Sequence, residues 1–306
     1  DWILSQIKDP VLQNSSAGFN DFSFYLDHHM DKTVVSAFIY TSNDRFDLSD
    51  INSYTYANRG ASLNVSHNFN NLLRMDLSMV GSRYSFNTVE NLNVSSAYSH
   101  SYAVNHYEFR ADFTQTINQE NELYFGFSGI NYRLDRGSVL PFGDESLRSA
   151  IHHGKEQGLE TALYVADKYD LTRWLTIHAG FRYAFYAPLG PESVFTYTEN
   201  HPKELLHIAD TLFFKQNQPL KWYHSPEARV SVNIVTDPNG TVKLAFNQMG
   251  QNLFMLNNTI AIAPNTQWKL ADYHIRPSRS NQYSVFGRHL QEPARDGHGS
   301  IGRGVL

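Results

Sequence analysis

The residues of this sequence best suited to chemistry are charged side chains that recur at every second position. Glu108, Arg110 and Asp112 follow one another at this spacing, and alternate residues of an extended chain lie on one face, about 7 Å apart. Such a ladder could steer a polar solute, but a water-filled channel needs a charged lining in any case. The same two interpretations apply to four further candidates, which are His178, Arg182, Arg229 and Lys243.

Two pairs of adjacent histidines raise the question of metal binding, because imidazole is the commonest ligand of transition metals. Neighbouring residues of a strand point to opposite faces, so such a pair chelates well only from a loop. His152 and His153 fall in an expected loop, where they could capture a metal or a metal chelate, whereas His28 and His29 fit a solvated turn. We therefore keep His152 and His153 as loop candidates and predict no resident metal.

The sequence lacks the common motifs of enzyme active sites. It has no G-x-S-x-G, no H-E-x-x-H and no G-x-x-x-x-G-K-[ST] phosphate loop. The carboxylates Glu145, Glu156 and Glu160 could in principle pair as acid and base, but nothing fixes their separation. We expect no catalytic residue and no cofactor, and thus no enzyme.

The elements that must position these side chains are predicted from strict alternation of apolar and polar residues, which is typical of strands with one apolar and one polar face. Along residues 107–113, for example, Tyr107, Phe109 and Phe113 alternate with the charged ladder. This pattern predicts eleven strands, at residues 20–28, 33–43, 54–67, 72–85, 100–116, 121–135, 158–169, 173–187, 222–235, 240–250 and 280–288.

The lengths of these strands and of their connections predict a membrane barrel. Several strands exceed the five or six residues usual in soluble sheets and suit a tilted crossing of about 9–11 residues. Short turns alternate with longer loops near residues 44–53, 86–99, 136–157, 188–221 and 251–279. We therefore predict an all-β fold, an antiparallel up-and-down transmembrane β-barrel segment. A propeller or a two-sheet sandwich is the alternative, but no repeat supports a propeller and sandwich strands are rarely this long.

Aromatic residues near the strand ends suit the girdles that such barrels place at the two membrane interfaces, although β-propensity alone also favours aromatics in strands. These residues are Tyr54, Tyr56, Tyr84, Phe86, Tyr132, Tyr169, Trp174, Tyr186, Trp222 and Tyr223.

Composition narrows the function further. The chain has 306 residues, of which 18% are charged, with a net charge of −5 and no cysteine. Disulfides and cysteine-bearing zinc sites are thereby excluded, and the negative balance makes nucleic acid a poor partner. No apolar run approaches the roughly 18 residues of a spanning helix. The segment after Asp1 lacks the features of a signal peptide, so we expect a mature product or an excised piece.

Several short motifs follow one another in a fixed order over residues 18–288. They are Phe24-Tyr25-Leu26 with Asn43-Asp44-Arg45-Phe46, the run from Glu160 to Asp167 with Ala179-Gly180-Phe181-Arg182-Tyr183, Pro226-Glu227-Ala228-Arg229 with the run from Asn247 to Leu256, and Trp268-Lys269-Leu270-Ala271 with Ile275-Arg276-Pro277-Ser278 and Gln282-Tyr283-Ser284-Val285. In this order and spacing they resemble the middle of the barrel of TonB-dependent outer-membrane receptors, of the type with a carboxypeptidase-like regulatory domain and a plug ahead of the barrel.

The resemblance implies a barrel of about 22 strands, which lies within the range of bacterial barrels; the chain would then hold about half. It divides the chain into an irregular lead-in at 1–19, a partial barrel at 20–288 and a tail at 289–306 that looks truncated or frame-shifted. It also implies that a plug and a TonB box would lie ahead of Asp1.

The function implied by the resemblance is active import of a scarce solute, such as a siderophore, vitamin, glycan or peptide, across the outer membrane. Its partners would be the lipid bilayer, the TonB complex through the plug region, and a surface lipoprotein. Loops 136–157 and 188–221 would contact ligand, because they are long and would face outward. Two alternatives remain: a passive porin or adhesin-type barrel, and a soluble carbohydrate-binding or hydrolytic β-protein.

Overall fold

The computed structural model describes residues 8, 13–49, 51–256 and 267–289. Its main element is one antiparallel sheet with the strand order β1-β2-β3-β4-β5-β6-β8-β9-β12-β13-β16 and the short β7 beside β6. The eleven strands of this path are β1 (Ser16–Met30), β2 (Thr33–Leu48), β3 (Asn52–Asn68), β4 (Leu73–Glu90), β5 (Tyr98–Thr116), β6 (Asn121–Pro141), β8 (Lys155–Thr172), β9 (Leu175–Leu189), β12 (Tyr223–Asp237), β13 (Gly240–Gln251) and β16 (Ser278–His289).

All eleven predicted strands are present, and most extend a few residues beyond the predicted ends. The connection expected at 44–53 is thereby reduced to residues 49–51 between β2 and β3, because both strands continue to the turn. Residues 1–7, 9–12 and 290–306, which include most of the expected lead-in and tail, lie outside the described residues.

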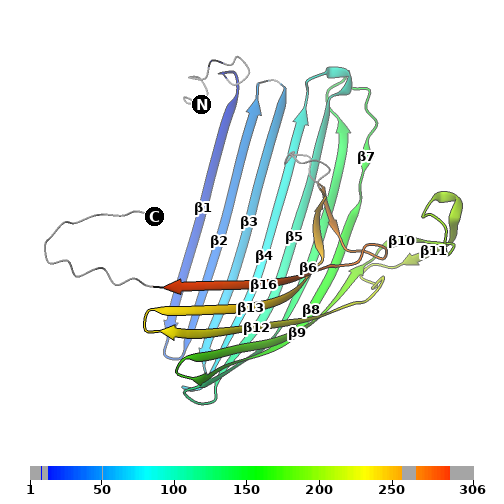
Figure 1. Ribbon diagram of the computed structural model, residues 1–306. Coiled ribbons are helices and arrows are strands. Elements are labelled where there is room, and N and C mark those ends of the chain that lie inside the picture. Colours follow the sequence, from blue (N-terminus) through cyan, green and yellow to red (C-terminus); the bar gives the residue numbers. More distant parts are fainter. Residues whose placement is uncertain (1–7, 9–12, 50, 257–266, 290–306) are drawn as a thin grey trace.

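The sheet is open and curved. Figure 1 shows β1 to β6 as long ribbons that lie side by side, with β9, β12, β13 and β16 running across them at a large angle. Since each strand of this path pairs with its neighbour in the order, the change of direction accumulates from the twist between successive strands. Within the described residues, β1 and β16 form the two edges and do not pair with each other. The sheet therefore has one convex and one concave face.

The convex face carries the apolar residues of the alternating pattern in continuous cross-strand rows. One row runs from Val65 through Leu77, Ala111, Phe127 and Leu163 to Tyr183. The next row contains Phe113, Phe125, Val165, Phe181 and Ala228. Leu163 is 63% exposed and Phe181 47% exposed, so these large side chains do not converge on an enclosed core.

The buried side chains lie mainly on the concave side. Phe86 and Tyr102 are almost completely buried and their rings lie 5.0 Å apart, with Tyr56 5.1 Å from Phe86. The girdle prediction is therefore wrong for Phe86 and Tyr186, which are buried, and fits Tyr169, Trp174 and Trp222, which are exposed.

Three of the longer connections contain elements that the sequence pattern did not predict. These are β7 (Ile151–His152), the hairpin of β10 (Glu192–Tyr197) and β11 (Ile208–Phe214), and the hairpin of β14 (Leu253–Leu256) and β15 (Gln267–Leu270). The described part of the chain also contains the short 3₁₀ turns η1 (Val94–Ser96) and η2 (Leu205–His207). No helix in the described part of the chain is long and apolar enough to cross a membrane.

Candidate functional site

The register of the sheet places one residue from each of five strands in a row on the concave face, and three of these residues are charged. Asp112 pairs with Gly126, and Gly126 pairs with Tyr164. Tyr164 in turn pairs with Arg182, and Arg182 pairs with Glu227. The row thus joins Asp112 to Glu227, which are more than a hundred positions apart in the sequence, through facing residues of adjacent strands that lie about 4.5–5.5 Å apart.

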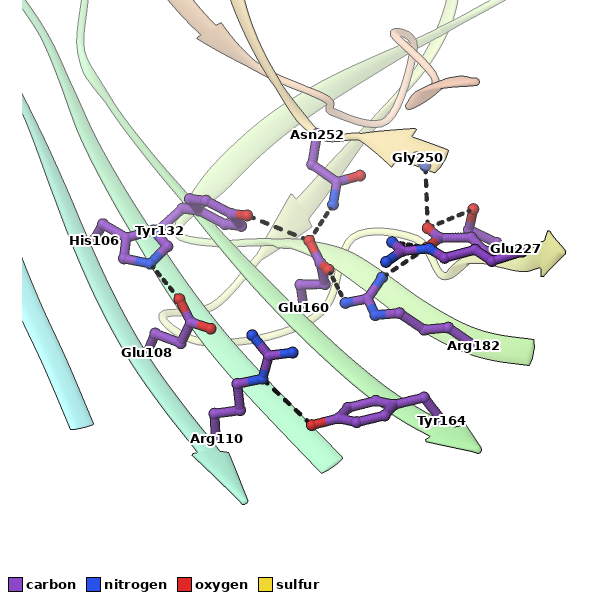
Figure 2. Close-up of polar contacts among 12 residues, drawn as sticks. His106, Glu108, Arg110, Tyr132, Glu160, Tyr164, Arg182, Glu227, Gly250 and Asn252 are labelled. Carbon is purple, nitrogen blue, oxygen red and sulfur yellow. Dashed lines mark hydrogen bonds and ion pairs between the residues drawn. The ribbon is translucent and has the colours of Figure 1, made fainter. Parts of the chain in front are cut away.

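Arg182 is the centre of this arrangement (Figure 2). Its Nη2 donates to Oε1 of Glu160 over 2.7 Å, and its Nη1 donates to Oε2 of Glu227 over 3.2 Å. The carboxylates are largely withdrawn from solvent, since Glu160 is 8% and Glu227 is 2% exposed. One guanidinium therefore contacts two buried carboxylates. Burying carboxylates costs free energy unless further hydrogen bonds satisfy their oxygens.

The remaining oxygens of both carboxylates find further donors. Asn252 Nδ2 donates to Glu160 over 2.6 Å, and the Tyr132 hydroxyl donates to Glu160 over 3.3 Å. The backbone amide of Gly250 donates to Glu227 over 3.0 Å. We call Glu160, Arg182, Glu227 and Asn252 the carboxylate network; it joins strands β8, β9 and β12 to the chain just after β13.

The predicted ladder of β5 lies on the same face, below this network. Arg110 pairs with Asp112 over 3.0 Å and donates to the hydroxyl of Tyr164, which itself donates to Asp112 over 2.6 Å. Glu108 lies 3.1 Å from the ring of His106. The ladder side chains are therefore engaged with one another and with neighbouring strands.

Most of the predicted lumen candidates line one cavity of about 530 Å³, which we call the ladder cavity. The candidates that line it are Glu108, Arg110, His178, Arg182, Arg229 and Lys243. Asp112 lies beside it, bonded to Arg110 and Tyr164. The structure thus brings together the residues that the alternation pattern selected, although it does not test whether they contact a ligand.

A second cavity, of about 550 Å³, begins on the other side of the carboxylate network, and we call it the network cavity. Glu160 and Glu227 line it, whereas their partner Arg182 lines the ladder cavity. Its other walls come from the ends of β9, β12 and β13 and from the segment that leads into β16. The carboxylate network therefore separates two polar hollows on one face.

The two loops that were expected to contact ligand meet in a third cavity, of about 540 Å³. Residues 153–157 and 188–197 line it together with the segment 269–274. Within it, Lys269 Nζ bonds Glu156 over 2.6 Å and Asp272 over 2.8 Å. These contacts fix the end of the β14–β15 hairpin against β8, where Leu270 and Ala271 are fully buried.

We call the contacts of Lys269 with Glu156 and Asp272 the anchor. The anchor holds the Asp272 carboxylate in its charged form. Burial alone would raise its pKa, but hydrogen bonds from Lys269 and from the backbone amides of Ile275 and His274 hold the pKa below its ordinary value of about 3.8. Asp272 lies in a connection, outside the spanning strands.

The two histidines that were expected in a loop, His152 and His153, have different surroundings. His152 belongs to β7 rather than to an irregular loop, and its Nδ1 lies 2.8 Å from the Ser138 hydroxyl. His153 turns toward His100, with ring centroids 6.4 Å apart, and its Nε2 is buried without a hydrogen-bond partner. In residues 8, 13–49, 51–256 and 267–289, no three His, Cys, Asp or Glu side chains form a group able to hold a metal.

Sequence reasoning missed the importance of Glu227, Tyr164 and Asn252. Alternation places Glu227 on the polar face of its strand, but only the register shows that it faces Arg182. Asn252 lies beyond the end of β13, where no period predicts its direction. The sequence offers Glu160 as one of several carboxylates of unknown separation and as the first residue of a resemblance motif, and neither indicates its partner.

Comparison with known proteins yields relatives by structure only. No protein-family model and no curated protein sequence matches this chain. Among solved structures, the ferric-catecholate import receptor Fiu of E. coli K12 aligns with a TM-score of 0.61 at 10% identity, over 89% of this chain and 49% of Fiu. The copper transporter OprC gives a TM-score of 0.65 at 8% identity, over 91% and 44%. The siderophore receptor PiuA of Acinetobacter baumannii gives 0.60 at 9%, over 90% and 48%.

These likenesses define the class of fold. The sheet is an antiparallel up-and-down segment of a large β-barrel, and the chain spans less than half the length of each of these three structures. The matched structures are TonB-dependent receptors. The chain therefore has the fold of part of a TonB-dependent receptor barrel, as the sequence resemblance predicted.

Proposed function

We propose that this chain forms part of the barrel wall of an outer-membrane, TonB-dependent transporter that imports a scarce solute. The main support for the proposal is that the two faces of the sheet differ in polarity, as they would if one faced lipid and the other water. Rows of large apolar side chains lie exposed on the convex face, and a bonded array of charges lies on the concave face. A contiguous apolar surface that crosses this many strands far exceeds what water-soluble monomers expose.

The convex rows suit contact with lipid tails. A membrane barrel turns apolar residues outward and polar residues inward with a period of two, and the band in contact with hydrocarbon is about 25 Å tall. The row Phe125–Val165–Phe181 is interrupted by no charge. Polar residues such as Arg83, Asn105 and Arg133 share the same face nearer the strand ends, where the band would give way to headgroups and water.

The concave face suits a passage for a polar solute. Charged side chains line the ladder cavity, the network cavity and the third cavity, which lies between the two long loops. In this proposal Glu108, Arg110, Asp112, His178, Arg182, Arg229 and Lys243 line the passage, and loops 136–157 and 188–221, with His152 and His153, meet the solute first.

We propose partners for this chain by analogy with receptors of the same fold. The bilayer of the outer membrane would cover the convex face, and a plug would occupy the concave side and connect the barrel to the TonB complex. A surface lipoprotein is a further partner if the solute is a glycan or a peptide. The net charge of −5 argues against nucleic acid, and we propose no enzymatic activity.

A conductance measurement on the full-length protein tests this function against a passive porin. In a planar lipid bilayer we expect no steady ion current, because a plug would fill the lumen, and we expect channels after urea releases the plug. Stable open channels without denaturant would contradict active transport and favour a porin. Purification in water without detergent would contradict the barrel itself and favour a soluble β-protein.

A further inference from the structure

Three cations line the network cavity, and none of them has a carboxylate partner among the described residues. Lys221, Arg276 and Arg279 all line it. In the part of the chain that the structure describes, no carboxylate lies within 4.0 Å of any of the three. The ladder cavity differs, because Arg110 is paired with Asp112 and Arg182 with two glutamates.

The two carboxylates that line the network cavity do not fully offset these cations. Glu160 and Glu227 are almost completely buried, and Arg182, Asn252 and the Gly250 amide occupy their oxygens. Arg182, which does not line the cavity, offsets one of their two negative charges, and the three cations outweigh the other. The open space is left with an excess of positive charge, which a low-dielectric wall strengthens.

Contacts to neighbouring groups restrain two of the three cations. The Lys221 ammonium lies 5.4 Å from the ring centroid of Tyr223 and 5.3 Å from that of Tyr273, within the range of cation–π attraction. One nitrogen of Arg279 donates to the backbone carbonyl of His224. Positioned cations lose less side-chain entropy when they bind a ligand than free ones do.

The aromatic part of the wall is fixed as well. Tyr186 and Tyr223 lie nearly parallel with centroids 6.5 Å apart, and their hydroxyls donate to the carbonyls of Ala271 and Asp272. These hydroxyls are therefore already used, and the tyrosines offer ring surface rather than free donors. The polar recognition in the cavity rests on the cations.

We infer that the network cavity binds a soluble small molecule that carries several anionic oxygens, as carboxylates or phosphates. This inference rests on the proposed function, since it names the class of solute that the passage would collect. The volume of about 550 Å³ lies within the usual range of small-molecule sites. Arg276 and Arg279 can each bind such oxygens through two parallel N–H groups, and Lys221 adds a point charge.

The test is calorimetric titration of the full-length protein in detergent with two probes, tricarballylate and inorganic phosphate. We expect tricarballylate to bind more tightly than phosphate, with an affinity that falls as salt is added. Substitution of Lys221→Gln, Arg276→Gln or Arg279→Gln should weaken binding about tenfold each, which corresponds to about 1.4 kcal/mol. The matched control Lys32→Gln, exposed in the turn between β1 and β2 and outside the cavities described above, should change the affinity less than twofold.

Equal binding by a triple variant of the three cations, or binding of the cation spermidine in place of tricarballylate, would overturn the inference. A signal with lipopolysaccharide but not with tricarballylate would also overturn it, because it would assign the cations to lipid headgroups. Each variant is also tested for heat-dependent mobility on gels. A folded barrel without anion binding refutes only this inference, whereas loss of the barrel in the unmutated protein refutes the proposed function.

Discussion

Arg182 of β9 donates a 2.7 Å hydrogen bond to Glu160 of β8, the adjacent strand. The same guanidinium binds Glu227 of β12, the strand on its other side. A single side chain therefore links three consecutive strands on the concave face. Its loss should affect both the stability of the sheet and the shape of the passage.

Removal of the Arg182 charge should destabilise the barrel strongly. Arg182→Leu leaves the buried Glu160 without a cation and Glu227 with only the exposed Arg229, 3.8 Å away. Breaking a buried ion pair in this way costs about 3–5 kcal/mol. The control Arg229→Leu removes a cation that is 54% exposed and 3.8 Å from Glu227, so we expect a loss below about 1 kcal/mol. Urea unfolding in lipid vesicles measures both. Equal losses for the two variants would show that the network is not a central element of the sheet.

The position of the Tyr164 side chain depends on Gly126, which has no side chain of its own. A Cβ built on Gly126 would lie 2.6 Å from the Tyr164 hydroxyl and 2.4 Å from the Ala111 carbonyl. Gly126→Val should displace Tyr164 from Asp112 and cost about 1–3 kcal/mol. Gly129, on the opposite face of the same strand, has open space at its Cβ, and Gly129→Val should change the free energy of unfolding by less than about 0.5 kcal/mol. A cost at Gly129 that matches Gly126 would refute this explanation.

A charge on the convex face should be costly, and the same charge on the concave face should be tolerated. We expect Leu163→Arg to destabilise the protein in lipid by about 2–4 kcal/mol, since a cation near the bilayer midplane loses its hydration. Ser231→Arg, at a position that lines the ladder cavity, should cost much less. If both substitutions had the same effect in vesicles of dioleoylphosphatidylcholine, the assignment of the two faces would be wrong.

The anchor at Asp272 predicts a dependence on pH. The pKa of Asp272 is lower in the folded protein than its ordinary value, so its contribution to stability is complete above that ordinary value and is lost as the pH falls through the lower, folded value. The difference in unfolding temperature between the unmutated protein and Asp272→Asn should therefore be constant above pH 5 and should shrink below about pH 3.8. A difference that instead grew on acidification would contradict the anchor.

The repeating part of the fold could be predicted from the sequence, because it follows from a period of two. Alternation located all eleven strands of the main path, and it placed Arg182, His178 and Glu108 on the polar face. Aromatic residues near strand ends were a weaker guide, because β-propensity favours them on both faces. Phe86 and Tyr186 accordingly pack inward instead of forming a girdle.

The partners of these side chains could not be predicted, because they depend on register and on irregular segments. Nothing in the sequence near Arg182 indicates that Glu160 and Glu227 lie to either side of it. The β14–β15 hairpin supplies Lys269 to Glu156 across more than a hundred residues, and no period describes such a segment. Long-range contacts of this kind are fixed only when the whole sheet has formed.

The central claim is that the convex face touches lipid and the concave face touches water, and β8 allows it to be measured directly. The chain contains no cysteine, so a single cysteine can be placed at each of residues 161–166 and labelled with a nitroxide. In protein reconstituted in vesicles, we predict that oxygen, which concentrates in lipid, relaxes labels at 161, 163 and 165, and that a water-soluble nickel chelate relaxes those at 164 and 166. The label at the buried Ala162 should be out of reach of both reagents. Equal access of both reagents at every position, or no alternation, would contradict the account.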